Sequence, residues 1–327
     1  MKILILAMPA SQLHGGYDYC NPVQQQAYWL TKYLDEKHDV TVVCLDGSSQ
    51  FKNMVTSHNN AELAAFTETK DQIKWGEYEL VIDYTVEKNS YSIIKEKGLK
   101  RLLMCHPLYH NYSTPPPLKY PCIVGTSDAH CQYLSERLGV PVRELPYGYE
   151  LPDKDVPERD NKGYLLYIGR IAKAKGVHEF LSLCKKNRFD AVIAGDDKNV
   201  EEGYVFNILE RCEGLNIRYM GCIDESVKMK LLSEAQALVI PYLSDFDAFV
   251  CSTLSIATAM KIPTIALNKG AVKEFINKGV NGFYVDTLEQ LYSFDFNKID
   301  GLTFDYNYKP KYARIEELIT AAISDPW

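Results

Sequence analysis

The segment YLLYIGRIAKAKGVHEFLSLCKKNRFDAVIA, residues 164–194, predicts the architecture of the whole chain. It begins with the apolar run YLLYI (164–168) and ends with a second apolar run, DAVIA (190–194). Between them, residues 176–187 repeat apolar side chains at the spacing of a helix that buries one face. A strand, a helix and another strand in this order form a βαβ unit, which is the building block of a parallel sheet.

The same alternation of apolar runs and helical patterns extends in both directions from this segment. Further strands are predicted at residues 2–8, 40–44, 79–83, 101–105, 121–126, 142–146, 216–220, 237–241, 263–267 and 282–285. Further helices are predicted at residues 23–37, from Ser127 onward, and at 202–212, 225–236, 252–261, 271–277 and 311–323. Ser127 and Asp224 are the expected N-caps of their helices. Residues 45–74 and 286–310 show no clear pattern.

The length of the chain indicates two domains rather than one. The 327 residues exceed the roughly 150 residues of a typical domain about twofold. The stretch LPDKDVPERDNK (151–162) is polar and contains proline, which is typical of a domain linker. We therefore expect an α/β protein with two Rossmann-like parallel-sheet domains that face a central cleft, the first over residues 1–152 and the second over 160–305.

Composition and charge argue against several classes of function. The net charge is −7 and the isoelectric point is near 5.6, whereas sequence-independent binding to nucleic acid or anionic lipid requires an excess of basic residues. The 9 cysteines contain no CxxC pair, so we expect reduced thiols and no zinc site. No segment has the length of a signal peptide or of a membrane span. We expect a cytoplasmic protein, with peripheral attachment to the inner face of a membrane as an alternative.

The strongest chemical signal lies where the strand at 164–168 ends. Gly169 and Arg170 follow this strand, and Lys175 comes just before the predicted helix. Two cations beside a helix N-terminus suit a diphosphate, because Arg can form paired hydrogen bonds to phosphate oxygens and the free amides add a favourable dipole. The alternative interpretation is a basic turn exposed to solvent.

Several longer segments occur in an order that is characteristic of one family. They are HGGYDY (14–19), KHDVTVV (37–43), IVGTSDAH (123–130), LPYGYELPD (145–153), YIGRIAKAKGV (167–177), AVIAGDD (191–197), NIRYMGCI (216–223), LLSEAQALVIPYL (231–243) and KIPTIALNKGAVKEFINKGVNGFYV (261–285). On these segments the chain resembles the family 4 glycosyltransferases of the GT-B fold. The resemblance implies a retaining transferase that uses a nucleotide-diphosphate sugar, with a UDP-sugar favoured. It also implies that the C-terminal helix, about 311–327, packs back on the first domain.

The resemblance assigns roles to particular residues. In the family, the Arg and Lys of a GR-x4-K pattern hold the diphosphate, and here they are Arg170 and Lys175. The glycine pair of the first loop, here Gly15 and Gly16, lets the backbone approach the donor phosphates, because glycine has no Cβ to clash. An ordinary turn is the alternative interpretation of that pair. We expect no cofactor and no metal, since the two cations can neutralise the leaving diphosphate.

The chain departs from the family at a pattern that is usually E-x-F-G-(x)4-E. The matching stretch is DFDAFVCSTLSI (245–256), in which Asp247 takes the place of the first glutamate. The second falls on Ser255, or on Ile256 if it is counted back from Pro263. The usual glycine is Val250. Main-chain amides near the start of the following helix are still expected to face the donor, at Phe249, Val250, Cys251 and Ser252. A loop or N-cap aspartate is the alternative interpretation of Asp247.

Two further side chains are candidates from their position along the chain. His106 follows the strand at 101–105, where it could hydrogen-bond a sugar hydroxyl or polarise the reacting centre. Glu274 lies after the strand at 263–267, near the nucleotide end of the site in the family. The structural alternatives are a histidine that only supports the fold and a glutamate that stabilises a helix dipole.

Other functions on the same fold stay open at this point. They are a nucleotide-sugar epimerase or phosphorylase-like enzyme, a phage-type DNA-base glycosyltransferase, and a non-catalytic member that binds a nucleotide or glycan. The acceptor is accordingly a glycan, a lipid-linked sugar, a small molecule or a modified base. A cluster of basic residues, Lys95, Lys97, Lys100 and Arg101, is the feature that keeps DNA or an anionic lipid head group among the partners.

Overall fold

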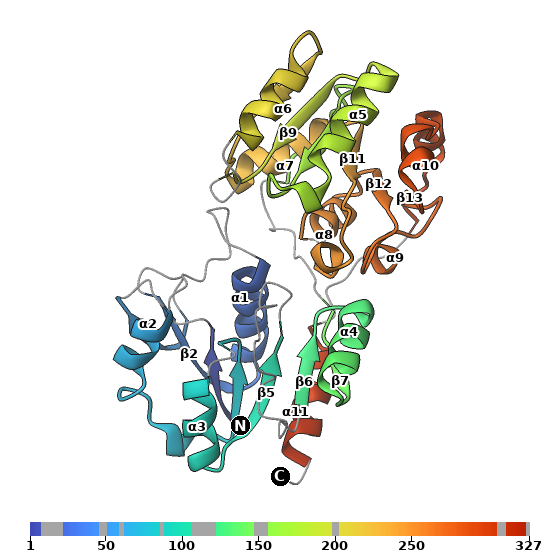
Figure 1. Ribbon diagram of the computed structural model, residues 1–327. Coiled ribbons are helices and arrows are strands. Elements are labelled where there is room, and N and C mark those ends of the chain that lie inside the picture. The colour runs from blue at the N-terminus through green and yellow to red at the C-terminus, as the bar shows by residue number, and fades with distance from the viewer. Residues whose placement is uncertain are drawn as a thin grey trace. The chain divides into compact units, whose positions relative to one another are not determined.

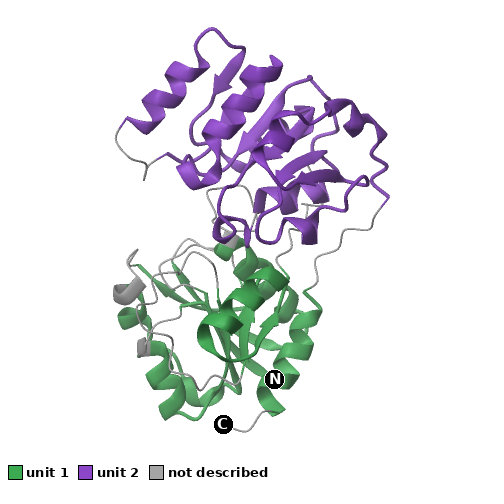
Figure 2. Ribbon diagram, turned by 45° about the vertical axis from the view of Figure 1, so that its right-hand side comes forward, with its two compact units in different colours: residues 1–148, 310–327 green, residues 149–309 purple. Residues whose placement is uncertain are grey.

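A computed structural model of the protein describes residues 1–7, 22–45, 51–58, 62–85, 88–105, 122–146, 156–197, 203–250, 252–305 and 312–324. The chain divides into two compact units (Figure 2). Unit 1 comprises Met1–Gly148 together with Pro310–Trp327, and unit 2 comprises Tyr149–Lys309.

Unit 1 is built on a seven-stranded parallel sheet (Figure 1). Its strands are β1 (Lys2–Leu6), β2 (Asp39–Leu45), β3 (Asn53–Ser57), β4 (Leu80–Asp83), β5 (Lys100–Met104), β6 (Cys122–Gly125) and β7 (Val142–Glu144). Their order across the sheet is β3-β2-β1-β4-β5-β6-β7. The order reverses between β1 and β4, which is the arrangement of a doubly wound sheet.

Helices cover both faces of this sheet because successive side chains of β1 point to opposite sides. Ile3 and Ile5 belong to one buried cluster, with side chains of α1 (Pro22–Asp35) and α11 (Arg314–Ser324). Leu4 and Leu6 belong to another, with side chains of α2 (Glu62–Thr69) and α3 (Lys88–Glu96). Helix α4 (Asp128–Leu138) and the short helix η1 (Trp75–Glu77) complete the described helices of the unit.

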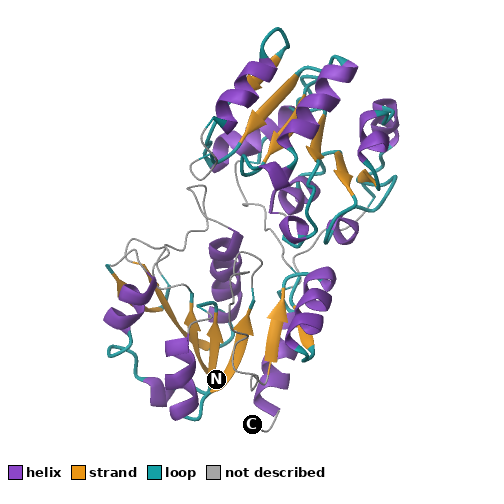
Figure 3. Ribbon diagram, in the orientation of Figure 1, coloured by secondary structure: helices purple, strands orange, loops and turns teal. Residues whose placement is uncertain are grey.

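Unit 2 is built on a six-stranded parallel sheet with helices beside it (Figure 3). Its strands are β8 (Leu165–Ile168), β9 (Ala191–Ala194), β10 (Ile217–Tyr219), β11 (Ala237–Ile240), β12 (Thr264–Leu267) and β13 (Gly282–Val285). Their order is β10-β9-β8-β11-β12-β13, so the reversal here falls between β8 and β11. These two strands are paired directly, with Leu165 beside Ala237 and Leu166 beside Leu238.

The helices of unit 2 follow its strands in turn. They are α5 (Val177–Asn187), α6 (Tyr204–Cys212), α7 (Glu225–Glu234), α8 (Ser252–Ala259), α9 (Val272–Phe275) and α10 (Leu288–Tyr292), with the 3₁₀ turns η3 (Lys173–Lys175), η4 (Phe246–Ala248) and η5 (Phe296–Gly301). The buried cluster of β8 includes Phe180 of α5, Ile208 of α6 and Leu291 of α10. Across the described segments of both units, every helix is too short or too polar to cross a bilayer.

The predicted α/β fold with two parallel sheets is confirmed, and so are both predicted N-caps. The Ser127 hydroxyl accepts a hydrogen bond from the amide of His130, and the Asp224 carboxylate accepts one from the amide of Val227. Several elements had no sequence prediction, and among them are β3, α2, α3, α10 and η5, which are short or only partly buried. A short element on the surface needs few apolar residues, so its periodicity is weak.

The expectation of a four-residue basic cluster is wrong for one of its members. Arg101 is fully buried and forms an ion pair with Asp83, which is also fully buried. The Asp83 carboxylate accepts further hydrogen bonds from the Thr85 amide at 2.8 Å and the Ser90 hydroxyl at 3.1 Å. A charge in the interior must be paired and hydrogen-bonded, and this network satisfies that requirement for Asp83. The exposed part of the cluster is therefore smaller than the sequence suggests.

Candidate functional site

The candidate site lies in unit 2, where the strand order reverses. Gly169 and Arg170 directly follow β8, and Tyr242 and Asp247 follow its neighbour β11. Parallel neighbours end at the same edge of a sheet, so two segments that are about 70 residues apart in the sequence meet there. This reversal point is the place where open α/β sheets bind their ligands.

The loop that carries Arg170 is held in place by hydrogen bonds to its main-chain atoms. The Gly169 amide donates to the Ala194 carbonyl at 3.1 Å, and the Ile171 amide donates to the Asp196 carbonyl at 2.9 Å. The Tyr167 hydroxyl donates to the Arg170 carbonyl at 2.9 Å. These bonds set the direction in which the chain leaves β8, and they leave the guanidinium of Arg170 outside the loop.

Gly195 makes the close approach of two loops possible. A Cβ added to this residue would lie 1.7 Å from the carbonyl oxygen of Gly169, far inside van der Waals contact. The loop after β9 can therefore pass beside the loop after β8 only with glycine at position 195. Gly195 is the fifth residue of the segment AVIAGDD (191–197).

Lys175 is the last residue of the turn η3, and Gly176 is its C-cap. Gly176 has a φ of 70°, and a Cβ at this position would lie 1.9 Å from the Pro241 carbonyl oxygen. The Leu243 amide donates to the Ala174 carbonyl at 2.9 Å. This hydrogen bond joins the segment after β8 to the segment after β11. Helix α5 begins at Val177, two residues after Lys175.

Arg170 and Lys175 converge on the carboxylate of Asp247. The Arg170 Nη2 lies 2.9 Å from Asp247 Oδ1, and the Lys175 Nζ lies 3.3 Å from the same oxygen. The Lys175 ammonium also donates to the Asp247 main-chain oxygen at 2.7 Å. The exposed fractions of the side chains differ widely: 56% for Arg170, 9% for Lys175 and 12% for Asp247. Two positive charges and one negative charge leave this cluster with a positive balance.

Asp247 is held in the turn η4 between β11 and α8. The Asp245 carboxylate accepts a hydrogen bond from the Gly270 amide at 2.9 Å, and the Ala271 amide donates to the Ala248 carbonyl at 3.0 Å. Gly270 has a φ of 47° and lies against this turn, where a Cβ would be 2.5 Å from the Asp245 carbonyl oxygen. The segment before α9 thus supports the turn that carries Asp247.

The residues that follow Asp247 are mostly buried. Phe249 is 6% exposed, its ring packs against Phe246 at 5.8 Å, and its amide lies 3.4 Å from the Phe246 carbonyl oxygen. Val250 is half-buried, and Ser252 is the first residue of α8. Ser255 and Ile256, the two candidates for the position of the second glutamate, are both 0% exposed. The structure therefore places no carboxylate at that position of the helix.

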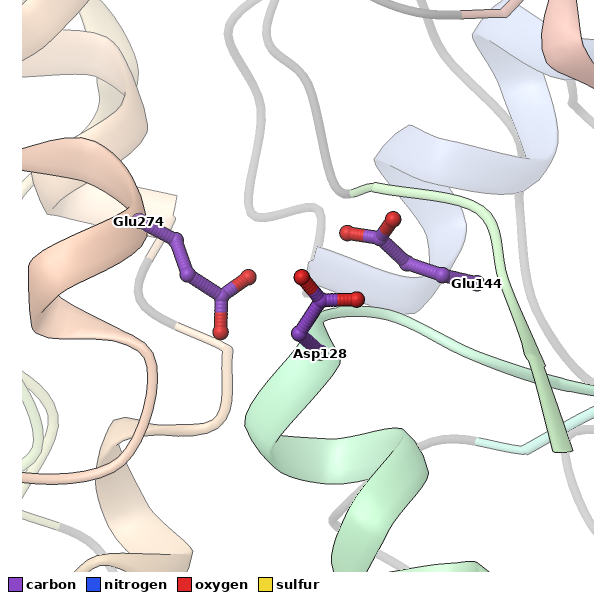
Figure 4. Close-up of side chains that lie close together, drawn as sticks. All are labelled: Asp128, Glu144 and Glu274. Atoms are coloured by element: carbon purple, nitrogen blue, oxygen red, sulfur yellow. The ribbon is translucent and has the colours of Figure 1, made fainter.

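Glu274 is exposed on the short helix α9 of unit 2. Figure 4 labels it together with two carboxylates of unit 1, Asp128 at the start of α4 and Glu144 at the end of β7. Asp128 and Glu144 have carboxylate oxygens within 4.8 Å of each other. Glu144 also forms an ion pair with Arg314 of α11 at 2.6 Å, which partly balances the negative charge there.

A tyrosine and an aspartate meet at the ends of β9 and β10. The Tyr219 hydroxyl donates to Asp197 Oδ2 at 2.8 Å. Burial, and then this hydrogen bond, raise the pKa of Tyr219 well above its usual range. The pair orients the Asp197 carboxylate at the same edge of the sheet as the cation cluster.

Some predicted site residues lie outside the described residues. They are Gly15, Gly16, His106 and Cys251. Of the others, the structure brings Gly169, Arg170, Lys175 and Asp247 together. Sequence reasoning did not single out Tyr242, whose ring lies 3.9 Å from the Lys175 ammonium, or Gly195. The sequence features that could have identified them are an aromatic residue at the end of a strand and a glycine before two aspartates.

Residues 150–291 match the family model of the glycosyl transferases group 1. The match covers most of unit 2, which is Tyr149–Lys309. The matched range of the group 1 model spans both β8 with its cation-bearing loop and the turn that carries Asp247. A search of curated proteins finds no match to the chain.

Solved structures of similar fold extend the comparison over both units. Sucrose-phosphate synthase from Thermosynechococcus elongatus has a TM-score of 0.68 at 15% identity, over 99% of this chain and 93% of that one. A glycosyltransferase from Rickettsia africae has a TM-score of 0.67 at 16% identity, over 99% of both chains. Anabaena Alr3699/HepE in complex with UDP-glucose has a TM-score of 0.63 at 14% identity, over 98% of this chain and 97% of that one. These likenesses show that the chain has the GT-B fold.

Proposed function

We propose that the protein is a retaining glycosyltransferase that moves a sugar, of the hexosyl type, from a nucleotide-diphosphate sugar to an acceptor hydroxyl. The observation that carries the proposal is the convergence of Arg170 and Lys175 at the edge of the sheet between β8 and β11. A fold neighbour, Alr3699/HepE, has been solved with UDP-glucose and with UDP. A UDP-sugar is therefore the favoured donor.

The two cations have a direct use in this chemistry. When the bond between the sugar and the diphosphate breaks, negative charge develops on the leaving oxygen. Arg170 can form paired hydrogen bonds to phosphate oxygens, and Lys175 adds a localised positive charge. Cations that are already in place stabilise the transition state without reorganising at the moment of reaction. Because these side chains supply the positive charge, the proposal gives no role to a metal ion, and EDTA should leave the activity unchanged.

Asp247 balances the site before the donor binds. Its carboxylate contacts both cations. A diphosphate that binds there must therefore either share the cations with this carboxylate or displace the carboxylate from the exposed Arg170. After displacement, a carboxylate of this kind is free to accept a hydrogen bond from a sugar hydroxyl. We propose this double use for Asp247, with Gly15, Gly16 and His106 completing the donor and sugar contacts.

The test compares nucleotides with and without the paired phosphates. Isothermal titration should show that Arg170→Ala and Lys175→Met each weaken UDP binding about tenfold or more, because each removes a charge-assisted contact. Binding of uridine should change less than twofold. Lys173→Met is the matched control, since it removes an exposed cation from the same turn as Lys175. Equal losses for UDP and uridine would reject the diphosphate role.

A second candidate is a member of the fold that binds a nucleotide or glycan but does not transfer a sugar. It is favoured by the absence of a second carboxylate after Asp247, because Ser255 and Ile256, the two candidates for the position of the second glutamate, are uncharged and fully buried. Mass spectrometry of products with UDP-sugars, with and without a panel of acceptors, separates the candidates. Acceptor-dependent product supports transfer, and tight UDP binding without any product supports the second candidate. A free, altered sugar formed without acceptor would instead indicate an epimerase.

A further inference from the structure

Lys175 is unusually buried for a lysine. Its side chain is 9% exposed, whereas lysines seldom lose contact with water unless a partner holds the charge. Two of its contacts come from Asp247, at 2.7 Å from the main-chain oxygen and 3.3 Å from the carboxylate. Another comes from Tyr242, whose ring centroid lies 3.9 Å from the ammonium nitrogen. This distance is well within the range of a cation–π interaction.

Tyr242 occupies the space between the two loops of the site. It is 3% exposed and follows the end of β11, the strand that lies beside β8 in the sheet. Its hydroxyl lies 3.1 Å from the place where a Cβ on Gly169 would be, so this part of the ring fits beside Gly169 because that residue is glycine. One end of the side chain thus meets the loop of Arg170, and its face meets the ammonium of Lys175.

A ring face and a carboxylate hold a cation with different consequences for an anionic ligand. A carboxylate neutralises the charge that it holds, whereas an aromatic face attracts the ammonium and leaves the full positive charge in place. Burial against the ring also restricts the lysine before any ligand arrives, which reduces the ordering that binding requires. Arg170, 56% exposed with one carboxylate contact, has no comparable support among the described contacts.

We propose that Tyr242 is a positioning residue for Lys175, and that it holds the ammonium in place to receive the paired phosphates of the donor. The inference rests on the proposed function, because it takes Lys175 as a diphosphate ligand. Tyr242 itself need not touch the donor. It affects donor binding through the electron-rich face of its ring, which attracts the ammonium of Lys175.

The experiment compares three side chains at position 242, with titration of UDP, uridine and inorganic pyrophosphate, which has the paired phosphates without a base. Tyr242→Phe keeps the ring and should bind UDP and pyrophosphate within about twofold of the wild type. Tyr242→Leu keeps an apolar side chain without a π face and should weaken both about fivefold to tenfold, the range of a partly desolvated cation–π contact. Trifluorophenylalanine at position 242 keeps the shape but withdraws electrons, and should give an intermediate loss. Uridine should be unaffected throughout.

The fluorinated variant keeps the test decisive if Tyr242→Leu fails to fold, because it preserves the volume of the ring. A double-mutant cycle provides the second criterion. In the Lys175→Met background, changes at position 242 should no longer alter UDP or pyrophosphate binding, because the ammonium is absent. Equal losses in both backgrounds, or no loss in the fluorinated protein, would overturn the role of Tyr242. If Lys175→Met alone leaves UDP and pyrophosphate binding unchanged, the proposed function fails instead.

Discussion

The ammonium nitrogen of Lys175 lies 2.7 Å from the main-chain oxygen of Asp247 and 3.3 Å from its carboxylate. These two contacts differ in kind, because the first survives any change of the Asp247 side chain and the second does not. Arg170 depends on the carboxylate, at 2.9 Å. A substitution of the Asp247 side chain can therefore change the charge at the site while Lys175 keeps its main-chain contact.

Asp247→Asn should raise the affinity for UDP and lower the rate of transfer. Removing one negative charge beside two cations favours an anionic ligand by about 1 kcal/mol, which is roughly fivefold in Kd at low salt. Lys175 keeps its main-chain contact, so the lysine should stay in place. Titration at two salt concentrations measures the gain. Glu213→Gln, which removes an exposed carboxylate at the end of α6, is the charge-matched control. Weaker UDP binding in Asp247→Asn would show that the carboxylate orders the cations rather than competing for them.

Gly195→Ala should destabilise the protein and disturb the site together. The added methyl group would lie 1.7 Å from the Gly169 carbonyl oxygen, so the loop that carries Arg170 must move. We expect a loss of about 2 kcal/mol in the free energy of unfolding, as for other overpacked positions. UDP affinity should fall with it. Gly301→Ala, with no atom within 4 Å of the new Cβ, should leave both unchanged. Wild-type stability in Gly195→Ala would contradict the close approach of the two loops.

Arg101→Met should destabilise the protein strongly through the charge that it leaves behind. Asp83 is fully buried, and without the guanidinium its carboxylate has no cation among its described partners. Breaking a buried ion pair on one side costs about 3–5 kcal/mol. Denaturation in urea measures the change. Lys100→Met, at the neighbouring and more exposed position, should change stability by less than about 0.5 kcal/mol. Similar effects of the two substitutions would argue against the importance of the pair.

His130 should make the protein sensitive to mild acid. Burial lowers the pKa of this imidazole from 6.5 to about 4, and its Nδ1 lies 3.3 Å from the Thr126 amide, which donates to it. Between pH 6.5 and 4 the unfolded chain binds a proton that the folded chain does not. The free energy of unfolding should therefore fall as the pH is lowered through this window, by on the order of 3 kcal/mol.

His130→Asn tests this origin, because the asparagine oxygen can accept the same hydrogen bond and does not titrate. Urea denaturation at several pH values should show a smaller loss of stability between pH 6.5 and 4 in this variant. His58→Asn removes an imidazole whose side chain is 75% exposed, and should leave the pH dependence as it is in the wild type. An unchanged slope in His130→Asn would assign the acid sensitivity to other groups.

Local patterns in the sequence were sufficient for the central strands, for most of the longer helices and for part of the site. Buried strands such as β8 and β11 are continuous apolar runs, because both faces of a parallel sheet are covered by helices. The N-caps Ser127 and Asp224 followed from side-chain chemistry over four residues. Arg170 and Lys175 could be singled out because a strand end, a glycine and a helix start lie within ten residues of each other.

The partners of these residues required the folded chain. Local periodicity does not specify which strands become neighbours, and the pairing of β8 with β11 is what brings Asp247 and Tyr242 to Lys175. The burial of Arg101 likewise depends on Asp83, which lies on the adjacent strand β4. Spacing and the family pattern along the chain thus singled out the two cations and Asp247, whereas the contacts among them and the ring beside Lys175 follow from the order of strands across the sheet.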